Sequence, residues 1–458
     1  CHEGVKETKQ AFGNLFSQVD YLCKARGIKV ADKIAIQTMR RHSNSQEPLS
    51  GEDLKYDARA LAIFISAVFG VDVPHELNVL IPHANRPYQK GLEINNRRIR
   101  CIVKNWDSDF IRVDIDQDAD EEEYLVRLKD EENHINHTYL WDLLKEGMQL
   151  NLLDCQVKQP IITPRLVVVE PDYLVDISSI ATCFTAFGHH PLLYLLNLMK
   201  PRANTQATLL GNFAGAALDD IINTHGKYQM NETVKTNFRE KALEFCTCPW
   251  FDAKKFYTDA SLQAFNLQQV VDILFPRTAS QAQMTAFRSE EFYDRKKAIL
   301  EPSFVCEALG IQGRVDLMTT DCKLLVEQKS GRNMNIESHQ TDPSYHSYQL
   351  EPHYVQLLLY YGVLQHNFKL SNERVNIRLL YSKYQPQDGL MVVAYYRKLF
   401  QEAITYRNQL VAASFEIAKE GFEHALNEFT PEVLNVAGTQ DFFYNKYLKP
   451  QLSAITDP

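Results

Sequence analysis

Three charged residues lie at the ends of two short apolar segments in the stretch GRVDLMTTDCKLLVEQKSG (residues 313–331). Asp316 begins the first segment, and Glu327 and Lys329 end the second at alternate positions. Because successive side chains of a strand point to opposite faces, Glu327 and Lys329 share one face and Gln328 points to the other. The sequence TTDC can turn the chain, so we expect an antiparallel hairpin in which Asp316 lies beside Glu327.

Two carboxylates and an ammonium in one strand pair are costly to bury without compensation. A bound Mg²⁺ or Mn²⁺ would supply it, since these hard cations prefer oxygen ligands. We predict that Asp316, Glu327 and the backbone carbonyl of Gln328 hold the ion, while Lys329 orients the attacking water. This is the chemistry of phosphodiester hydrolysis. The alternative is a surface hairpin with an ordinary Glu/Lys face, and on so short a pattern the two interpretations weigh about equally.

Further residues around this hairpin fit a catalytic interpretation. Gly310 and Gly313 precede Asp316 and indicate a bend or a close approach of the backbone. Gln356 and Tyr360 are four residues apart in EPHYVQLLLYYGVLQHN, which is predicted to be a helix, so they share one helix face.

The order and spacing of G-x-x-D, E-x-K and Q-x-x-x-Y resemble the signature of RecB-type nucleases in the PD-(D/E)xK superfamily. The chain is most similar to the nuclease module of the bifunctional nuclease–helicases of DNA replication and end resection. VVVEPDYLVDISSIATCF, LLGNFAGAALDDII, EPSFVCEALGIQGRVD and AITYRNQLV resemble that family's segments in the same order. The resemblance covers roughly residues 150–415.

This resemblance implies a metal-dependent DNA nuclease that acts on single-stranded ends or flaps, held by backbone contacts and base stacking. It implies Glu301 as a further acidic position that could bind the metal ion, and Arg407, His189 and His190 as DNA contacts. The implied catalytic residues are Asp316, Glu327, Lys329, Gln356 and Tyr360.

The chain also departs from the family pattern. Gly215 stands where the family helix carries a metal-binding histidine. Cys183 matches the first cysteine of the family's [4Fe–4S] cluster, but no cysteine follows Cys322, so we predict no iron–sulfur cluster. No G-x-x-x-x-G-K-[ST] motif occurs, so no ATP site is expected. The resemblance implies a helicase module beyond Pro458 in the full protein.

Composition limits the other possibilities. The net charge of −9 argues against a surface coated with cations for nonspecific nucleic-acid binding. No apolar run is long enough to span a membrane, and the first residues lack the pattern of a secretion signal. The nine scattered cysteines are typical of thiols kept reduced inside the cell. We therefore expect a cytoplasmic protein without a membrane partner, of bacterial type.

The hydrophobic patterns predict three regions in an α/β protein. Residues 1–82 are predicted to be helical, and residues 83–170 to form a small β-barrel of the oligonucleotide-binding type. Residues 171–458 are predicted to form an α/β layer with a mixed sheet, followed by C-terminal helices. The resemblance implies that this layer is a PD-(D/E)xK core.

Two rival interpretations remain open. The first is a DNA-binding or scaffold module of the same fold with weakened catalysis. The second is an unrelated domain in which the motifs occur by coincidence.

Overall fold

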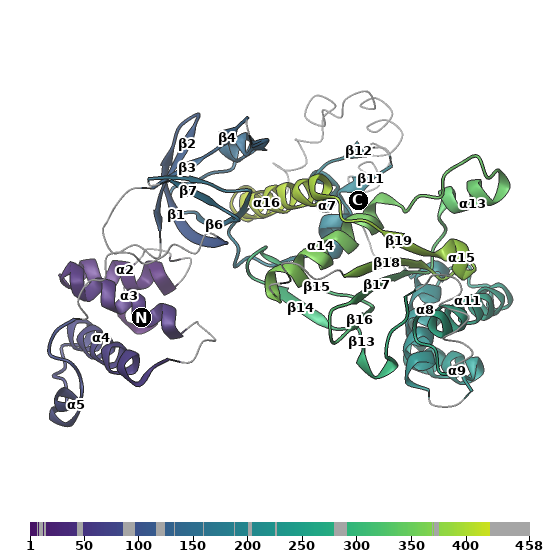
Figure 1. The fold of residues 1–458 in the computed structure, drawn as a ribbon, viewed down its shortest axis with the longest axis horizontal. Helices are drawn as coiled ribbons and strands as arrows, with labels where there is room; N and C mark the ends of the chain where they lie inside the picture. The colour runs from purple at the N-terminus through teal and green to yellow at the C-terminus, as the bar shows by residue number, and fades with distance from the viewer. Residues whose placement is uncertain are drawn as a thin grey trace. The chain divides into compact units, whose positions relative to one another are not determined.

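The structure is a computed structural model that divides the chain into two compact units, residues 1–167 and 168–458 (Figure 1). The acidic stretch DQDADEEE (116–123) and the end of the predicted C-terminal helices lie outside the described residues. The structure describes residues 1–421 apart from 7, 9–11, 13–14, 44–48, 86–96, 116–123, 132, 159, 187, 200–203, 225–226, 279–290, 369 and 371–374.

The first unit begins with helices, as predicted. Ser50 caps the longest of them in a reciprocal arrangement, because its hydroxyl accepts from the Asp53 N–H while the Asp53 carboxylate accepts from the Ser50 N–H. Buried apolar side chains, among them Val19, Leu22 and Phe64, form a small core between the helices. The helices are α1 (His2–Val5), α2 (Leu15–Ala25), α3 (Val30–Ser43), α4 (Gly51–Phe69) and α5 (His75–Leu80).

A seven-stranded sheet follows, in the order β7-β8-β3-β2-β1-β6-β9. Strands β1 and β2 alternate buried and half-buried side chains over most of their length, the pattern of a sheet with one face on a core. The pairings among the described strands give an open order, so the predicted closed barrel is not confirmed. The strands are β1 (Arg98–Trp106), β2 (Phe110–Ile115), β3 (Tyr124–Arg127), β6 (Gln149–Leu153), β7 (Gln156–Lys158), β8 (Ile161–Thr163) and β9 (Leu166–Val169), beside a small pair β4 (Lys129–Asp130) and β5 (Ile135–Asn136) and the 3-10 helix η1 (Thr138–Asp142).

The second unit is built on a five-stranded sheet in the order β13-β16-β17-β18-β19. Strands β17 and β18 are parallel, and their other neighbours are antiparallel, so the predicted mixed sheet is confirmed. Helices α8 and α11 share a hydrophobic core with β16, β17 and β18, and α14 packs against β17 and β18 (Figure 1). These elements are β13 (Ala298–Leu300), β16 (Leu317–Thr319), β17 (Leu324–Lys329), β18 (Asn376–Tyr381), β19 (Leu390–Val393), α8 (Gln206–Asn223), α11 (Ala253–Leu274) and α14 (Glu351–Asn367).

The second unit also contains a three-stranded sheet with the order β10-β15-β14. None of the helices among the described residues is both long and apolar enough to cross a bilayer. The remaining elements are β10 (Val175–Asp176), α6 (Ile177–Ala181), β11 (Phe184–Thr185), β12 (Gly188–His189), α7 (Leu192–Met199), α9 (Met230–Glu240), α10 (Ala242–Cys246), η2 (Arg295–Lys297), β14 (Ser303–Cys306), β15 (Ile311–Arg314), α13 (Met334–Thr341), α15 (Pro386–Gly389) and α16 (Arg397–Glu420).

A buried polar network ties helix α11 to the carboxyl ends of the two parallel strands. The Gln328 amide donates to the Ser382 hydroxyl at 2.7 Å, and this hydroxyl donates to Gln263 Oε1 at 2.6 Å. The Asn266 amide donates to the Ser382 carbonyl at 3.0 Å. All four side chains are at most 8% exposed, so these hydrogen bonds replace most of those that water would make, although Asn266 Oδ1 has no partner.

Arg407 of helix α16 was predicted to contact DNA, and the structure corrects this. The side chain is completely buried. Its guanidinium donates to the backbone carbonyls of Gly310 at 3.1 Å, Glu170 at 2.9 Å and Tyr173 at 2.5 Å, and also to that of Val169. Five fixed N–H donors let one arginine satisfy several carbonyls at once, so Arg407 joins α16 to two distant loops.

The substitution Arg407→Lys is expected to lower the free energy of unfolding by about 3 kcal/mol, because a lysine ammonium cannot reach these carbonyls together and leaves some unpaired. Urea unfolding followed by circular dichroism measures the loss. The exposed Arg397→Lys at the start of the same helix serves as the control and should change stability by less than about 0.5 kcal/mol. Equal stability of both variants would contradict the assigned role.

Candidate active site

The predicted hairpin is present, with Asp316 directly before β16 and Glu327 within β17. Strands β16 and β17 pair antiparallel, with Leu317 opposite Val326, and the same register places Asp316 opposite Glu327. The Asp316 carboxylate accepts a hydrogen bond from the Gln328 backbone N–H at 2.6 Å. The G-x-x-D and E-x-K motifs are therefore in contact in the folded chain.

Lys329 and Gln356 complete a closed set of contacts around Glu327. The Lys329 ammonium lies 2.8 Å from Glu327 Oε1 and 2.9 Å from Gln356 Oε1. The Gln356 amide donates to the same Glu327 oxygen at 2.6 Å. Helix α14 thus presents the first residue of Q-x-x-x-Y directly to the E-x-K strand.

The Glu327 carboxylate is buried close to a second carboxylate, and both conditions disfavour its charged form. It is 2% exposed, and its second carboxylate oxygen, Oε2, is buried without a hydrogen-bond partner. Burial and the neighbouring charge of Asp316 raise the pKa of Glu327 to about 8, against the opposing effect of Lys329. Burial also raises the pKa of Asp316, although the Gln328 N–H favours its charged form. A cation between these carboxylates would relieve this cost.

The Gln328 backbone faces the same site. Its N–H points to Asp316, whereas the carbonyl of Lys329 accepts from the Ser382 N–H on the other side at 2.9 Å. Because the N–H and C=O of one strand residue point to the same side, the Gln328 carbonyl also points toward the Asp316 strand. This agrees with the predicted ligand role.

Glu301 lies in the same row across the sheet. Leu300 pairs with Leu317, and the Glu301 N–H donates to the Asp316 carbonyl at 3.0 Å. Three acidic residues therefore follow one another across the sheet: Glu301 directly after β13, Asp316 directly before β16, and Glu327 within β17. In the structure the Glu301 carboxylate forms an ion pair with Arg314 at 3.0 Å.

Helix α8 contributes a carboxylate that the sequence analysis missed. Gly211, Gly215 and Asp219 are spaced by four and share a face. A side chain at Gly211 would lie 3.3 Å from the hydroxyl of Ser330, the residue after Lys329, and one at Gly215 would meet nothing within 4 Å. Burial, together with Glu301 and Asp316, raises the pKa of Asp219 to about 7. Its position one turn after the missing histidine was the available signal.

Tyr360 and the two glycines have structural roles beside the site. The Tyr360 hydroxyl donates to the Arg314 carbonyl at 2.6 Å, which holds the segment leading to Asp316. A side chain at Gly313 would lie 2.9 Å from the Tyr360 ring. Gly310 has a φ of 60°, in the left-handed region that favours glycine. The close approach predicted at these glycines is therefore to protein side chains.

The two histidines predicted to contact DNA, His189 and His190, lie at the end of strand β12 and directly after it. His189 is held between two carboxylates, 2.9 Å from Glu351 at the start of α14 and 2.9 Å from Glu402 on α16. His190 is half-buried, and its backbone N–H donates to the Cys183 carbonyl at 3.0 Å. His189 therefore bridges helices α14 and α16, and its contact with DNA stays a prediction.

Independent comparisons do not add a family to this geometry. The sequence matches no protein-family model, and a search of curated proteins finds no significant match. Within the part of the chain that the structure describes, no three or more His, Cys, Asp and Glu side chains are arranged to hold a metal ion. The chemistry must therefore be argued from the contacts themselves.

The two ion pairs of His189 predict that the stability of the folded protein depends on pH. Burial lowers the pKa of His189, but the Glu351 and Glu402 carboxylates outweigh this and raise it to about 9. Because the folded state holds the proton more tightly than the unfolded state, the stabilisation is complete below about pH 6.5 and is lost as the pH rises through about 9. Replacing His189 by Gln should cost about 1–3 kcal/mol at pH 6 and little at pH 9.5.

Urea unfolding at both pH values measures this difference. The exposed His75→Gln on helix α5 is the control and should leave both free energies unchanged. A loss at His189 that is equal at the two pH values would attribute the effect to packing and not to charge.

Proposed function

We propose that the chain is a metal-dependent deoxyribonuclease that hydrolyses phosphodiester bonds on a PD-(D/E)xK core. The observation that carries the proposal is the contact set in which Lys329 and Gln356 meet at one oxygen of Glu327, with Asp316 on the adjacent strand. Residues up to 40 positions apart converge here in the order of the E-x-K and Q-x-x-x-Y motifs. The order of the motifs along the sequence and the contacts between their side chains support the proposal independently.

The donor set suits Mg²⁺ or Mn²⁺. These ions prefer oxygen, keep several waters, and are often bound by only one or two carboxylates together with the oxygens of a phosphate. Asp316, the unpartnered Oε2 of Glu327 and the Gln328 carbonyl would hold the ion, with Glu301 or Asp219 as a further carboxylate. When bound, the ion would make its water more acidic and neutralise charge on the phosphate. Binding of such an ion does not require three protein side chains that are already arranged around the site.

Lys329 is the residue best placed to act on the reacting groups. Glu327 and Gln356 take two of its three N–H donors, which leaves one for a water or a phosphate oxygen. Its charge then favours the transition state, in which negative charge on the phosphate increases. Gln356 is a positioning residue, because it fixes both the ammonium and the carboxylate beside it.

A DNA-binding scaffold with weakened catalysis is the second candidate. It is favoured by Gly215 in place of a metal-binding histidine and by the engagement of Glu301 with Arg314. In that case the carboxylates would contribute to folding but not to turnover.

The catalytic proposal predicts that Lys329→Ala lowers the rate of Mn²⁺-dependent cleavage of a DNA oligonucleotide by at least about 100-fold, because water orientation and charge stabilisation are both removed. Asp316→Asn should abolish cleavage as well as the rise in melting temperature that Mn²⁺ produces in the unsubstituted protein, since bound ligands stabilise the folded state. Gel analysis of cleavage and thermal unfolding with Mn²⁺ measure the two effects.

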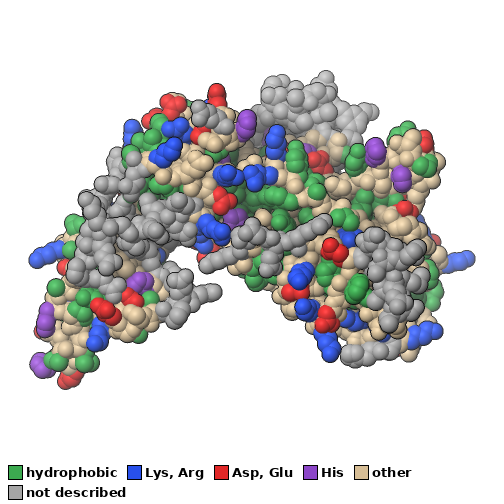
Figure 2. All heavy atoms as spheres, in the orientation of Figure 1, with side chains coloured by type: hydrophobic (Ala, Val, Ile, Leu, Met, Phe, Trp, Pro, Cys, Tyr) green, Lys and Arg blue, Asp and Glu red, His purple; other side chains and the backbone are tan. Residues whose placement is uncertain are grey.

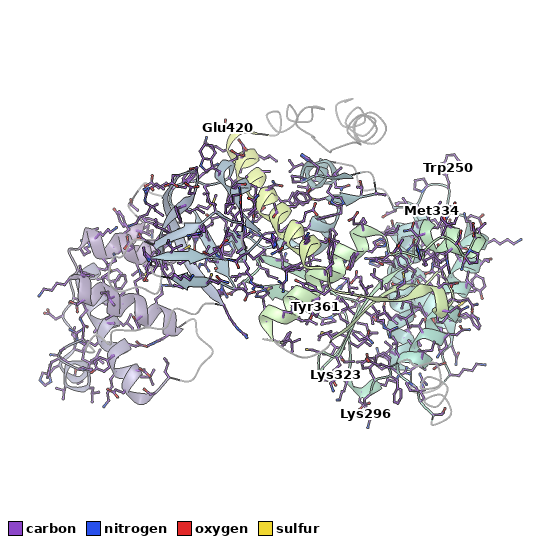
Figure 3. All side chains as sticks on the ribbon, turned by 45° about the horizontal axis from the view of Figure 1, so that its top comes forward. Trp250, Lys296, Lys323, Met334, Tyr361 and Glu420 are labelled. Carbon is purple, nitrogen blue, oxygen red and sulfur yellow. The ribbon has the colours of Figure 1, made fainter. Side chains whose placement is uncertain are left out.

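Lys323→Ala is the matched control, because Lys323 precedes the same strand β17 at its opposite end (Figure 3). It should cleave and bind Mn²⁺ as the unsubstituted protein does. DNA binding without any cleavage in Mn²⁺ would support the scaffold, and cleavage that survives Lys329→Ala would contradict the proposed site.

The open space at Gly215 gives a gain-of-function prediction. Gly215→His would place an imidazole on the α8 face that includes Asp219, with no clash at its Cβ. We expect at least about a threefold tighter Mn²⁺ affinity, because an imidazole is a good ligand for such ions, and a slightly more stable helix. Isothermal calorimetry measures the affinity. Gly215→Ala stabilises the helix without a ligand, so equal Mn²⁺ binding by the two variants would contradict the prediction.

A further inference from the structure

The segment between α13 and α14, DPSYHSYQL, carries large rings at its surface. Tyr345 is 60% exposed and Tyr348 is 57% exposed, and His346 is also exposed. The rings of His346 and Tyr348 lie 5.6 Å apart at a tilt of 49°. Met334, at the start of α13, is 59% exposed and lies at the periphery of the second unit (Figure 3). We name Tyr345, His346 and Tyr348 the aromatic segment.

The backbone of the aromatic segment is held in place although its rings are free. The Asn333 and Asn335 amides donate to the Tyr348 carbonyl at 2.9 and 3.2 Å. His339 Nδ1 lies 2.6 Å from the Tyr345 carbonyl. The Leu350 N–H donates to the Tyr381 hydroxyl at 3.0 Å. Exposed rings on a fixed backbone lose little freedom when they bind a partner.

The same anchors lead to the carboxylate site. Asn333, which is completely buried and caps α13, is only four residues after Lys329. Tyr381, which holds the other end of the segment, pairs with Lys329 in the parallel ladder. The aromatic segment is therefore attached at the carboxyl ends of two parallel strands, where α/β sheets place their ligands.

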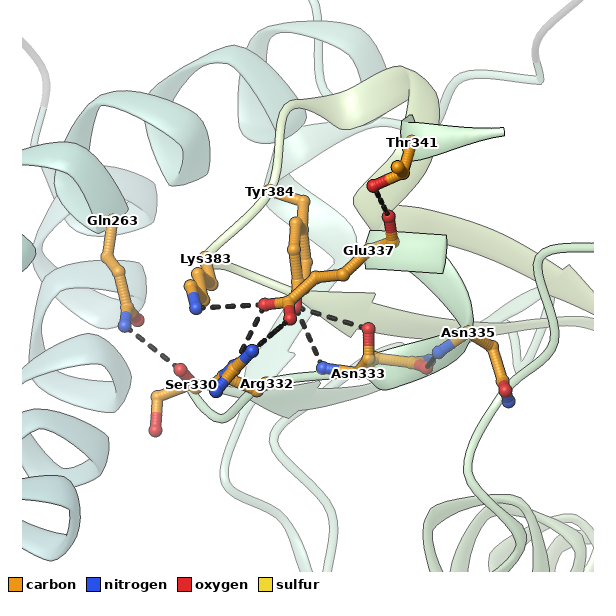
Figure 4. A network of polar contacts seen from close by, with 9 residues as sticks. All are labelled: Gln263, Ser330, Arg332, Asn333, Asn335, Glu337, Thr341, Lys383 and Tyr384. Carbon is orange, nitrogen blue, oxygen red and sulfur yellow. Dashed lines mark hydrogen bonds and ion pairs between the residues drawn. The ribbon is translucent and has the colours of Figure 1, made fainter. Parts of the chain in front are cut away.

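Two cations lie at the same edge, in the network of Figure 4. Arg332 and Lys383 both pair with Glu337, at 3.0 Å and 3.1 Å, and their side chains are 63% and 36% exposed. The Tyr384 hydroxyl, 3.0 Å from Glu337, accepts from the Asn333 N–H at 2.8 Å. One carboxylate thus orients two partly exposed cations in the network that includes Asn333, the residue whose amide holds the Tyr348 carbonyl.

We infer that the aromatic segment stacks against unpaired bases of the DNA strand that enters the carboxylate site, with Arg332 and Lys383 facing its phosphates. The inference rests on the proposed function and names the substrate as single-stranded. Stacking onto a protein ring requires a base with a free face, which a paired and stacked duplex does not offer. Hydrophobic and histidine side chains lie at the surface around α13, together with acidic side chains (Figure 2).

The test compares binding in EDTA, where metal-dependent cleavage does not proceed. Fluorescence anisotropy is measured with a labelled adenine homopolymer of about 12 nucleotides, an abasic strand of the same length and a duplex. Replacing both Tyr345 and Tyr348 by Ala should weaken binding of the adenine strand by at least about 10-fold and leave the abasic strand and the duplex unchanged. Replacing both by Phe keeps the rings and should stay within about twofold of the unsubstituted protein.

Phe238→Ala on helix α9, which removes a ring that is 50% exposed, is the control for loss of a surface aromatic and should bind as the unsubstituted protein does. Melting temperatures verify that every variant is folded. Unchanged binding by the double Ala variant, or an equal loss on abasic and adenine strands, overturns the inference. Failure of the unsubstituted protein to bind any of the three also overturns it.

The further inference and the proposed function can be disproved independently of each other. Ring-dependent binding of the adenine strand without cleavage in Mn²⁺ supports the aromatic segment and contradicts the nuclease. Cleavage that depends on Lys329 but is the same in the double Ala variant supports the nuclease and contradicts the aromatic segment.

Discussion

The structure of the second unit depends on the placement of two carboxylates, Asp316 and Glu327, opposite each other in a buried strand pair. Burial in a medium of low dielectric is costly for both charged forms and raises the pKa of both groups, and the charge of Asp316 raises the pKa of Glu327 further. The backbone N–H of Gln328, the Lys329 ammonium and the Gln356 amide offset part of it. One carboxylate oxygen still has no partner, and folding stability alone does not explain that arrangement.

The surrounding elements keep this pair in register. A one-residue slip of β16 against β17 would turn Asp316 to the opposite face and leave Glu327 buried without it. The network through Gln263 and Ser382 fastens the end of β17 to α11, while Gln356 fastens it to α14. The strand is thus fixed from both faces of the sheet by polar contacts that hold only in one register.

Local patterns in the sequence were sufficient for the hairpin, for helix α14 and for the helix face that Gln356 and Tyr360 share. These features depend on the alternation of side chains along a strand, on the four-residue spacing of side chains on one helix face, and on short loops. All three can be recognised from residues that are close in sequence. The roles of Arg407 and His189 could not be derived in this way. Both are cations in a resembling motif, yet their partners, Gly310 and Glu351, are nearly 100 or more residues away in sequence. Whether a cation faces solvent or bridges two helices is decided by tertiary packing.

The use of its cations also limits how this chain can hold a polyanion. Arg407 and His189 stabilise the fold, and Arg277 and Arg295 donate to the last carbonyls of α8, including that of Thr224 at 2.7 Å. With a net charge of −9, long-range attraction of a phosphate backbone is weak. Recognition close to the carboxylates therefore has to come from a few oriented cations and from contacts that do not depend on charge. Exposed rings on an anchored backbone, directly connected to the strand that carries Lys329, are the groups that meet this requirement.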